Sequence, residues 1–208
     1  MNLLIVAATR FEIEPFLKKN NSPEILITGV GIPATIFHVT KKIIEKKFDY
    51  VIQAGIGGTF TDSLNLADVV AIKQDTFGDL GIDESGNFSD LFEVGFLDKN
   101  DFPFSDGWLV NPNSLNEKIK LTKARSVTIN KITDDPQQLK KLKQKYMPEV
   151  ESMEGAAFHY VCLQQKINFL QLRGISNKVG ERDKKNWQIK NAIENLNKEL
   201  LEIIKNLS

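Results

Sequence analysis

Hydrophobic residues in this chain gather into short runs bounded by turn-forming residues, a pattern typical of strands buried in a sheet. The runs predict six strands, at Asn2–Ala8, Ile25–Thr28, Tyr50–Ala54, Ala67–Lys73, Ala124–Asn130 and Asn168–Arg173. Between several of them the spacing of apolar residues changes from a continuous run to every third or fourth position. That spacing is the period of one face of an α-helix.

Three stretches carry this helical spacing. One predicts a helix from about Pro33 to Lys46, with the proline near its start, where its missing N–H is harmless. A second has Asp135 as cap and Pro136 in the first turn, followed by an apolar stripe of Leu139, Leu142 and Tyr146. The third is a long amphipathic terminal helix over Ile189–Leu207. Strands that alternate with helices predict an α/β fold, with a largely parallel sheet covered on both faces.

One segment, Thr76 to Pro112, shows no clear period and is rich in glycine, aspartate and phenylalanine. A stretch of this length inside a compact domain is more often a functional segment or part of an interface than a simple connecting loop. Its phenylalanines and Trp108 suggest burial against another surface, with a second subunit as one candidate.

Composition narrows the class of protein. With 208 residues, 41% of them hydrophobic, the chain can bury one substantial core, and we expect a single domain over residues 1–208. Lys plus Arg and Asp plus Glu both number 27, so the net charge is zero. This balance argues against nucleic acid or a membrane surface as the main partner.

The single cysteine and the amino-terminal segment narrow the class further. Cys162 lies among apolar residues and predicts a buried, inert thiol, with no disulfide framework and no clustered metal-ligand pattern. We therefore expect no metal and no cofactor. The amino-terminal apolar run is too short for a signal or membrane segment and predicts a first strand in a cytoplasmic protein.

Two glycine-rich stretches follow predicted strands. The first, "GVGIPA" at Gly29–Ala34, matches the spacing of a dinucleotide-binding fingerprint, but no acidic residue ends the second strand, so a plain strand-turn-helix glycine pair is favoured. The second, "QAGIGGT" at Gln53–Thr59, contains Gly57 and could present backbone amides to a sugar or an anion. A tight turn that requires positive φ explains it equally well.

Carboxylates stand at two junctions between strands and helices. Glu12 follows the first strand, and it could be catalytic or merely solvated. Glu154, in "EVESMEGAAFHYVC", falls in the first turn of a predicted helix, where a negative charge complements the helix dipole or could bind a sugar. Farther on, "QLRGISNKVGERDKKNW" predicts a strand that runs into a polar loop carrying Arg173, Ser176, Asn177 and Arg182. An amide at a strand's carboxyl end can both donate to and accept from a planar heterocycle.

Taken in order, these pieces resemble the nucleoside phosphorylase and nucleosidase superfamily, and most closely its futalosine hydrolase branch. The matching stretches are "AATRFEIEP", "QAGIGGTF", "VESMEGAAFHYVC" and "RGISNKVGERDKKNW", with "DLG" and "VTIN" between them. The resemblance implies a three-layer α/β sandwich around a mixed, partly barrel-like sheet. It also implies cleavage of the N-glycosidic bond of a purine nucleoside, in menaquinone biosynthesis, by a homodimer or higher homo-oligomer whose neighbouring subunit closes the pocket.

The resemblance assigns roles residue by residue. It implies that Glu12 is the general base that activates water, and that Met153 and Glu154 pack on the ribose and bind its hydroxyls. Asn177 stands where the related methylthioadenosine/S-adenosylhomocysteine nucleosidases have an aspartate that protonates adenine. We expect Gly57 and Ser176 to contact the substrate as well, and Arg182 to be the first candidate for the carboxylated tail of futalosine. Glu151 is left outside the predicted site.

Asparagine in place of aspartate at position 177 indicates which purine base is released. The purine leaves with the bonding electrons, so it must be protonated or hydrogen-bonded. An amide can donate to O6 of a 6-oxopurine while its carbonyl accepts from a protonated N7, so Asn177 fits hypoxanthine better than adenine. The source of the N7 proton is open, with solvent as one candidate.

The nucleophile, water or phosphate, distinguishes a hydrolase from a phosphorylase. A phosphorylase needs cations near the anomeric carbon, whereas Arg10 is the only early arginine and lies beside Glu12, so water is favoured over phosphate. An adenine-specific nucleosidase, a purine nucleoside phosphorylase and a non-catalytic nucleotide-binding module remain the alternatives.

Overall fold

The computed structural model describes residues 1–19, 23–112 and 119–207. Its main sheet contains β1 (Leu3–Ala7), β2 (Glu24–Ile27), β3 (Tyr50–Thr59), β4 (Val69–Phe77), β7 (Leu109–Val110), β8 (Thr122–Thr128), β9 (Val150–Ser152) and β10 (Asn168–Lys178). A separate hairpin pairs β5 (Gly81–Glu84) with β6 (Asn87–Asp90). The helices are α1 (Arg10–Lys19), α2 (Ile32–Glu45), α4 (Pro136–Tyr146), α5 (Gly155–Gln164) and α6 (Ile189–Leu207), with a short 3-10 helix, η1, at Lys184–Asn186.

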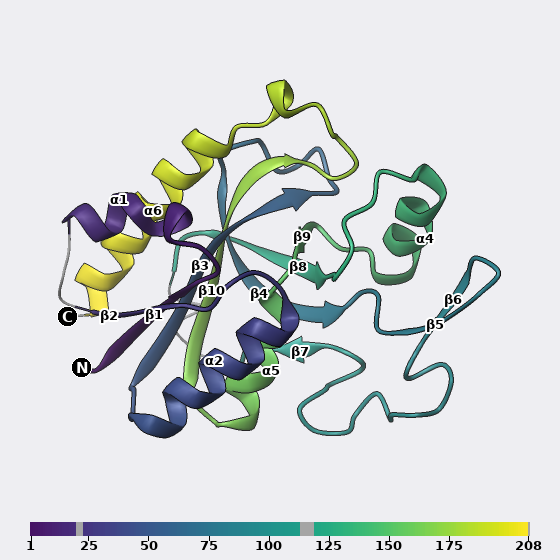
Figure 1. Cartoon of the computed structure of the whole chain (residues 1–208), viewed down its shortest axis with the longest axis horizontal. Helices are drawn as coiled ribbons and strands as arrows, with labels where there is room; N and C mark the ends of the chain where they lie inside the picture. The colour runs from purple at the N-terminus through teal and green to yellow at the C-terminus, as the bar shows by residue number, and fades with distance from the viewer. Residues whose placement is uncertain (20–22, 113–118, 208) are drawn as a thin grey trace.

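The sheet closes on itself. Strands β10, β4, β8, β9 and β3 are paired in that order, and β3 pairs again with β10, which completes a barrel-like ring. Strands β1 and β2 extend the sheet from the amino-terminal half of β3 (Figure 1). The β4–β10 and β3–β9 pairs are antiparallel, and the other pairs of the ring are parallel. The mixed, barrel-like sheet expected from the family resemblance is therefore confirmed.

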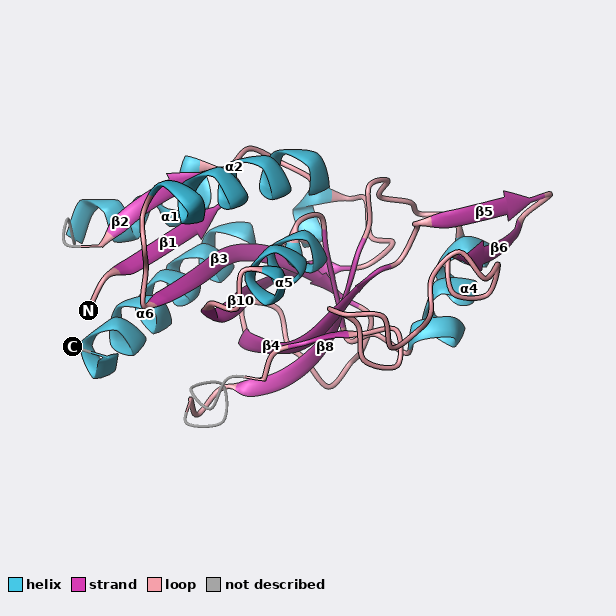
Figure 2. Ribbon diagram, turned by 90° about the horizontal axis from the view of Figure 1, so that it is seen from below, coloured by secondary structure: helices cyan, strands magenta, loops and turns pink. Residues whose placement is uncertain are grey.

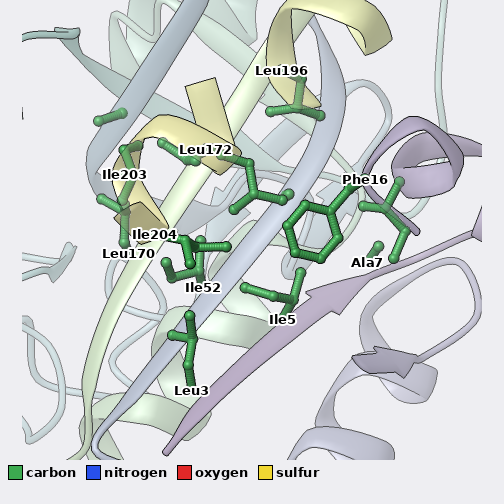
Figure 3. Packing of buried hydrophobic residues seen from close by; sticks show 14 residues of the cluster. Leu3, Ile5, Ala7, Phe16, Ile52, Leu170, Leu172, Leu196, Ile203 and Ile204 are labelled. Carbon is green, nitrogen blue, oxygen red and sulfur yellow. The ribbon is translucent and has the colours of Figure 1, made fainter. Parts of the chain in front are cut away.

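Helices cover both faces of the sheet, as the alternation of elements predicted (Figures 1 and 2). Along β1 successive side chains point to opposite faces: Leu3, Ile5 and Ala7 pack toward α1 and α6, whereas Leu4 and Val6 pack toward α2 and α5. Figure 3 shows the first of these cores, in which Phe16 of α1 and Leu196 of α6 meet the strands. A third apolar cluster joins strands of the ring through Val70, Ile72, Ala124, Val150 and Ile175.

All six predicted strands are present, but three of them run past the carboxyl-terminal ends that the apolar pattern indicates. Strand β3 continues through the glycine-rich stretch to Thr59, β4 continues to Phe77, and β10 continues to Lys178. Of the two interpretations of Gln53–Thr59, the tight turn with positive φ is therefore wrong, because Gly55, Gly57 and Gly58 do not have positive φ. The polar loop expected after Arg173 is likewise strand for five further residues, because β3 and β10 pair in parallel as far as Thr59 and Lys178.

The predicted helices are confirmed, and α1 is an addition to them. Asp135 caps α4 as expected: its Oδ1 accepts from the backbone N–H of Gln137 at 2.8 Å and of Gln138 at 3.3 Å. Helix α1 escaped the pattern because it is short and contains Pro15. Asn197 of α6 anchors it, since its side chain donates to the carbonyl of Glu12 at 2.8 Å and accepts from Phe16 N–H at 3.1 Å.

The aperiodic segment Thr76–Pro112 contains the β5–β6 hairpin and β7, and the hairpin lies beside α4 at the end of the molecule far from the termini (Figures 1 and 2). Phe92 and Phe104 stack edge to face, and Phe104 also contacts Tyr160. Phe96 and Phe102 are exposed in the single chain. No helix in the described ranges is long and apolar enough to cross a membrane.

Candidate active site

A cavity of about 330 Å³ opens at the carboxyl ends of β1, β3 and β10, beside the amino terminus of α5. This is the edge of an α/β sheet at which ligands usually bind. The walls include all seven residues that the sequence placed in the site, namely Glu12, Gly57, Met153, Glu154, Ser176, Asn177 and Arg182. The fold thus brings together residues that lie up to 170 positions apart, while the role of each remains a prediction.

Glu12 is held rigidly in the first turn of α1. It is 7% exposed, and its Oε2 accepts from both the backbone N–H and the hydroxyl of Thr9 at 2.9 Å. Its Oε1 accepts from Ile56 N–H of β3 at 3.0 Å. These donors point both carboxylate oxygens into a defined position at the cavity wall, so the alternative of a solvated surface glutamate does not describe this side chain.

Glu154 occupies the N-cap position of α5, but its side chain does not cap that helix. Its Oε1 instead accepts from Gly31 N–H at 3.0 Å, in the turn between β2 and α2. Burial raises the pKa of Glu154, whereas the Arg173 guanidinium and the Gly31 N–H oppose the rise. The carboxylate therefore connects the start of α5 to the turn before α2.

Arg173 is a buried cation behind the cavity, and sequence reasoning gave it no role. It is 1% exposed and lies 3.7 Å from the Glu154 carboxylate, and it donates to the Gln53 side chain at 3.0 Å. A Cβ at Gly55 would lie 2.3 Å from Arg173 Nη1 and 3.0 Å from Glu12 Oε1. The absence of a side chain at this position of β3 therefore leaves room for both the Arg173 guanidinium and the Glu12 carboxylate.

Gly57 and Met153 form parts of the wall near Glu12 and Glu154. A Cβ at Gly57 would approach the carbonyl oxygen of Glu151 to 2.8 Å, so this position requires glycine for the close contact between β3 and β9. Met153 is partly exposed, next to the buried Glu154.

Ser176 and Asn177 stand on β10 at a shift in its register with β3. The Ser176 hydroxyl hydrogen-bonds to Asn177 Oδ1 at 2.8 Å, and Asn177 Nδ2 donates to the carbonyl of Lys178 at 2.9 Å. An amide offers two N–H donors and two acceptor lone pairs. One donor and one lone pair of Asn177 therefore remain available to a ligand.

The small residues at the start of α5 let the helix approach the sheet closely, over a buried polar cluster. The hydroxyl of Thr128 donates to Asp75 at 3.0 Å and accepts from Ala156 N–H at 2.7 Å. A Cβ at Gly155 would lie 2.2 Å from Asp75 Oδ2. Burial raises the pKa of Asp75 to about 6, opposed mainly by the Thr128 hydroxyl.

Acidic side chains dominate the charge around the cavity. Among the lining residues in the described ranges, Glu12, Glu151, Glu154 and Glu181 are carboxylic acids, and Arg182 is the single cation. Arg10, which the sequence set beside Glu12, is exposed at the start of α1 and is absent from the lining. Such a wall disfavours an anion beside the attacking position.

Glu151 was left outside the predicted site, yet it lines the cavity. It is 8% exposed, and burial together with the charge of Asp79 raises its pKa to about 7. Its signal in the sequence was a charged residue between Val150 and Ser152 in a short buried strand. The described part of the chain contains no group of three or more His, Cys, Asp or Glu residues arranged to hold a metal.

Comparison with known proteins agrees with this architecture. A family model described as "Phosphorylase superfamily" matches residues 7–207. The chain belongs to the phosphorylase superfamily. Among curated proteins of this superfamily, a futalosine hydrolase from Thermus thermophilus is 26% identical over 93% of this chain and 91% of its own length. A 5'-methylthioadenosine/S-adenosylhomocysteine nucleosidase from Shewanella loihica is 29% identical over 74% of this chain and 68% of its own length.

Solved structures of the superfamily share the fold. A Helicobacter pylori 5'-methylthioadenosine/S-adenosylhomocysteine nucleosidase superposes with a TM-score of 0.82 at 17% identity, covering 99% of this chain and 98% of the other. A futalosine hydrolase from the same organism has a TM-score of 0.79 at 18% identity, with the same coverage. The predicted family, the fold class and the expectation of an N-glycosyl hydrolase type of enzyme are confirmed.

Proposed function

We propose that this phosphorylase-superfamily protein hydrolyses the N-glycosidic bond of futalosine, releasing hypoxanthine and dehypoxanthine futalosine. The observation that carries the proposal is the charge of the cavity wall, in which four carboxylic acids face one arginine among the described lining residues. A hydrolase needs a carboxylate on its water, whereas a phosphorylase needs cations around its phosphate. The wall therefore favours water as the nucleophile.

Glu12 is the proposed general base. Its two oxygens are already oriented by Thr9 and Ile56, so the carboxylate needs little reorganisation before it accepts a proton from water. Glu154 is the proposed acceptor for the ribose hydroxyls, and Met153 provides an apolar surface beneath the sugar. Gly57 and Ser176 complete the proposed contacts around the sugar and base.

Asn177 is the proposed contact for the base. Its free N–H can donate to O6 of hypoxanthine, while its free lone pair accepts from a protonated N7. Adenine carries an amino group at position 6, which would set a donor against the amide N–H. This chemistry, together with two curated futalosine hydrolase relatives, favours a 6-oxopurine substrate.

An adenine-releasing nucleosidase is the second candidate, because other curated relatives are 5'-methylthioadenosine/S-adenosylhomocysteine nucleosidases. The family resemblance supplies two further parts of the proposal, a place in menaquinone biosynthesis and a homodimer or larger homo-oligomer. The length and composition supply a single domain over residues 1–208, and the amino-terminal segment supplies a cytoplasmic location. Arg182, which is exposed at the cavity wall, is the proposed contact for the carboxylate of the futalosine tail.

The proposal is tested by incubating the protein with futalosine, inosine and methylthioadenosine, each with and without phosphate, and separating the free bases by chromatography. We expect hypoxanthine from futalosine at a rate independent of phosphate. Turnover that requires phosphate would establish a phosphorylase instead. Ligand binding without release of any base would favour a non-catalytic binding module.

The role of Asn177 is tested on the same substrates with Asn177→Asp. An aspartic acid can donate to adenine N7 while accepting from the 6-amino group, so we expect the variant to lose at least tenfold in kcat/KM on futalosine and to gain on methylthioadenosine. Asn186→Asp, which lies outside the cavity lining, is the matched control. An unchanged ratio of the two specificity constants would contradict the assignment.

A further inference from the structure

Glu151 and Asn177 stand on opposite sides of a bare glycine in the same rung of the sheet. Gly58 of β3 pairs with Glu151 of β9 on one side and with Asn177 of β10 on the other. Side chains directly opposite each other on neighbouring strands point to the same face. A Cβ at Gly58 would lie 2.9 Å from Val179 Cγ2 and 3.3 Å from Asn177 Nδ2, so the Val179 side chain and the Asn177 amide lie over the glycine on the same face.

Neighbouring strands lie about 4.8 Å apart, so the Cα atoms of Glu151 and Asn177 are separated by roughly 10 Å. The side chain of Val179 lies over Gly58 between them. All three residues of the rung line the cavity. A planar base that rests on Val179 above Gly58, with one edge on Asn177, therefore has its opposite edge toward Glu151.

The carboxyl group of Glu151 differs from the other buried acids at the cavity because its hydrogen bonding is incomplete. Donors hold both oxygens of Glu12, and Gly31 N–H holds one oxygen of Glu154. The Oε2 atom of Glu151 is buried and has no hydrogen-bond partner in the described ranges. A buried carboxylate without partners is costly, whereas the protonated acid is neutral and carries a donor.

The surrounding charges act on Glu151 from two sides. Burial is the main cause that raises its pKa to about 7, and Asp79, which follows β4, adds to the rise, while Arg182 lowers it. Glu12, Glu154 and Glu181 face it across the cavity. Glu151 also lines a second cavity, of about 560 Å³, whose titratable groups are Asp79, Asp83, Glu93, Lys131, Lys141, Lys145 and Tyr146. At neutral pH a substantial fraction of Glu151 is therefore the neutral acid.

We propose that Glu151 donates a proton to the leaving purine, at the edge that Asn177 does not hold, where N3 is the acceptor. This inference rests on the proposed nucleoside hydrolysis and gives the leaving base its one proton, which the amide of Asn177 cannot supply. The proton on N3 takes the place of the proton on N7, so N7 keeps its lone pair and Asn177 donates its free N–H to O6 or N7 in this step. The bond between N9 and C1' breaks with both electrons moving to the base, and the Glu151 proton is transferred to N3. Water adds its oxygen to C1' and gives one proton to Glu12. Exchange with solvent then removes that proton and reprotonates Glu151.

The test compares wild type, Glu151→Gln and Glu149→Gln, using the nucleoside from which wild type releases a base. General acids typically contribute factors of 10²–10⁴, so we expect Glu151→Gln to lower kcat about 10²-fold. In wild type, kcat/KM should fall as the pH rises through about 7, because the acid must be protonated. In Glu151→Gln this alkaline decline should disappear. A residue that only supports the strand would not remove it.

Glu149→Gln is the matched control because it makes the same substitution two residues earlier, outside both cavities. Its carboxylate accepts from Arg125 N–H at 2.9 Å, and an amide oxygen can replace that acceptor. Thermal unfolding should show that all three proteins are folded. A Glu151→Gln rate within threefold of wild type, or a retained decline near pH 7, would overturn this inference alone. Absence of base release by wild type would overturn the proposed function, and this inference with it.

Discussion

Replacing Glu12 by glutamine is expected to lower the rate of base release about 10³-fold while the protein remains folded. A general base contributes 10²–10⁴-fold, and glutamine retains the size of the side chain but cannot accept a proton from water. One of the donors that now meet the carboxylate, Thr9 N–H or Ile56 N–H, would face the new amide group. Because a lost hydrogen bond costs about 1 kcal/mol, the midpoint of thermal unfolding should fall by only a few degrees.

The measurement is the initial rate of base release at saturating substrate, with thermal unfolding followed by circular dichroism on the same samples. Glu14→Gln is the matched control, since Glu14 lies on the same helix but is exposed and pairs with Lys18 at 3.3 Å. The control should keep the wild-type rate. Turnover by Glu12→Gln within tenfold of wild type would remove Glu12 from the role of base.

Replacing Arg173 by methionine is expected to destabilise the fold by about 3–5 kcal/mol, the usual cost of removing one partner from a buried ion pair. Arg173 is 1% exposed, and its loss leaves the Glu154 carboxylate without its cation and Gln53 Oε1 without its donor. Methionine fills most of the volume, so the loss reports the charge and hydrogen bonds rather than a cavity. Arg10→Met is the control, because Arg10 is exposed and outside the cavity lining.

The pH dependence identifies the cause of this destabilisation. Burial raises the pKa of Glu154, and Arg173 opposes that rise, so the variant should raise the pKa further. A carboxyl whose pKa is higher in the folded state binds more protons when folded, so stability decreases as the pH rises through that pKa. Arg173→Met should therefore lose more stability at pH 8 than at pH 5, measured by urea unfolding. Adding Glu154→Gln should abolish the difference, and a cost below 1 kcal/mol for Arg173→Met would contradict the ion-pair account.

The apolar pattern located the strands because buried parallel strands are continuous hydrophobic runs, and it located α2, α4 and α6 by their helical period. It missed the carboxyl-terminal halves of β3 and β10, which are rich in glycine and polar residues. These halves are strands because they pair with each other and with neighbouring strands of the ring. Pairing between distant segments has no local signature, so the pattern ended each strand too early.

The sequence likewise predicted the residues of the candidate site but not their contacts. The resemblance to the superfamily, carried by the motifs, selected Glu12, Glu154 and Asn177. The fold places all three in the cavity wall, while their roles stay predictions. The surroundings of Glu12 and Glu154 are seen only in the tertiary structure, because Gly55, Gly31 and buried Arg173 belong to separate elements. The sequence alone did not predict these contacts, because the residues lie far apart along the chain.

Glu151 shows the difference most clearly. Its neighbours in sequence predicted a strand residue of no special role, whereas the closed ring places it one glycine away from Asn177. Local periodicity was thus enough to predict the strands and layers, and the motifs were enough to indicate the family and the candidate residues. Which side chains meet across the sheet, and which buried acid lacks a partner, depended on strand register and burial, because both arise only when remote segments pack together.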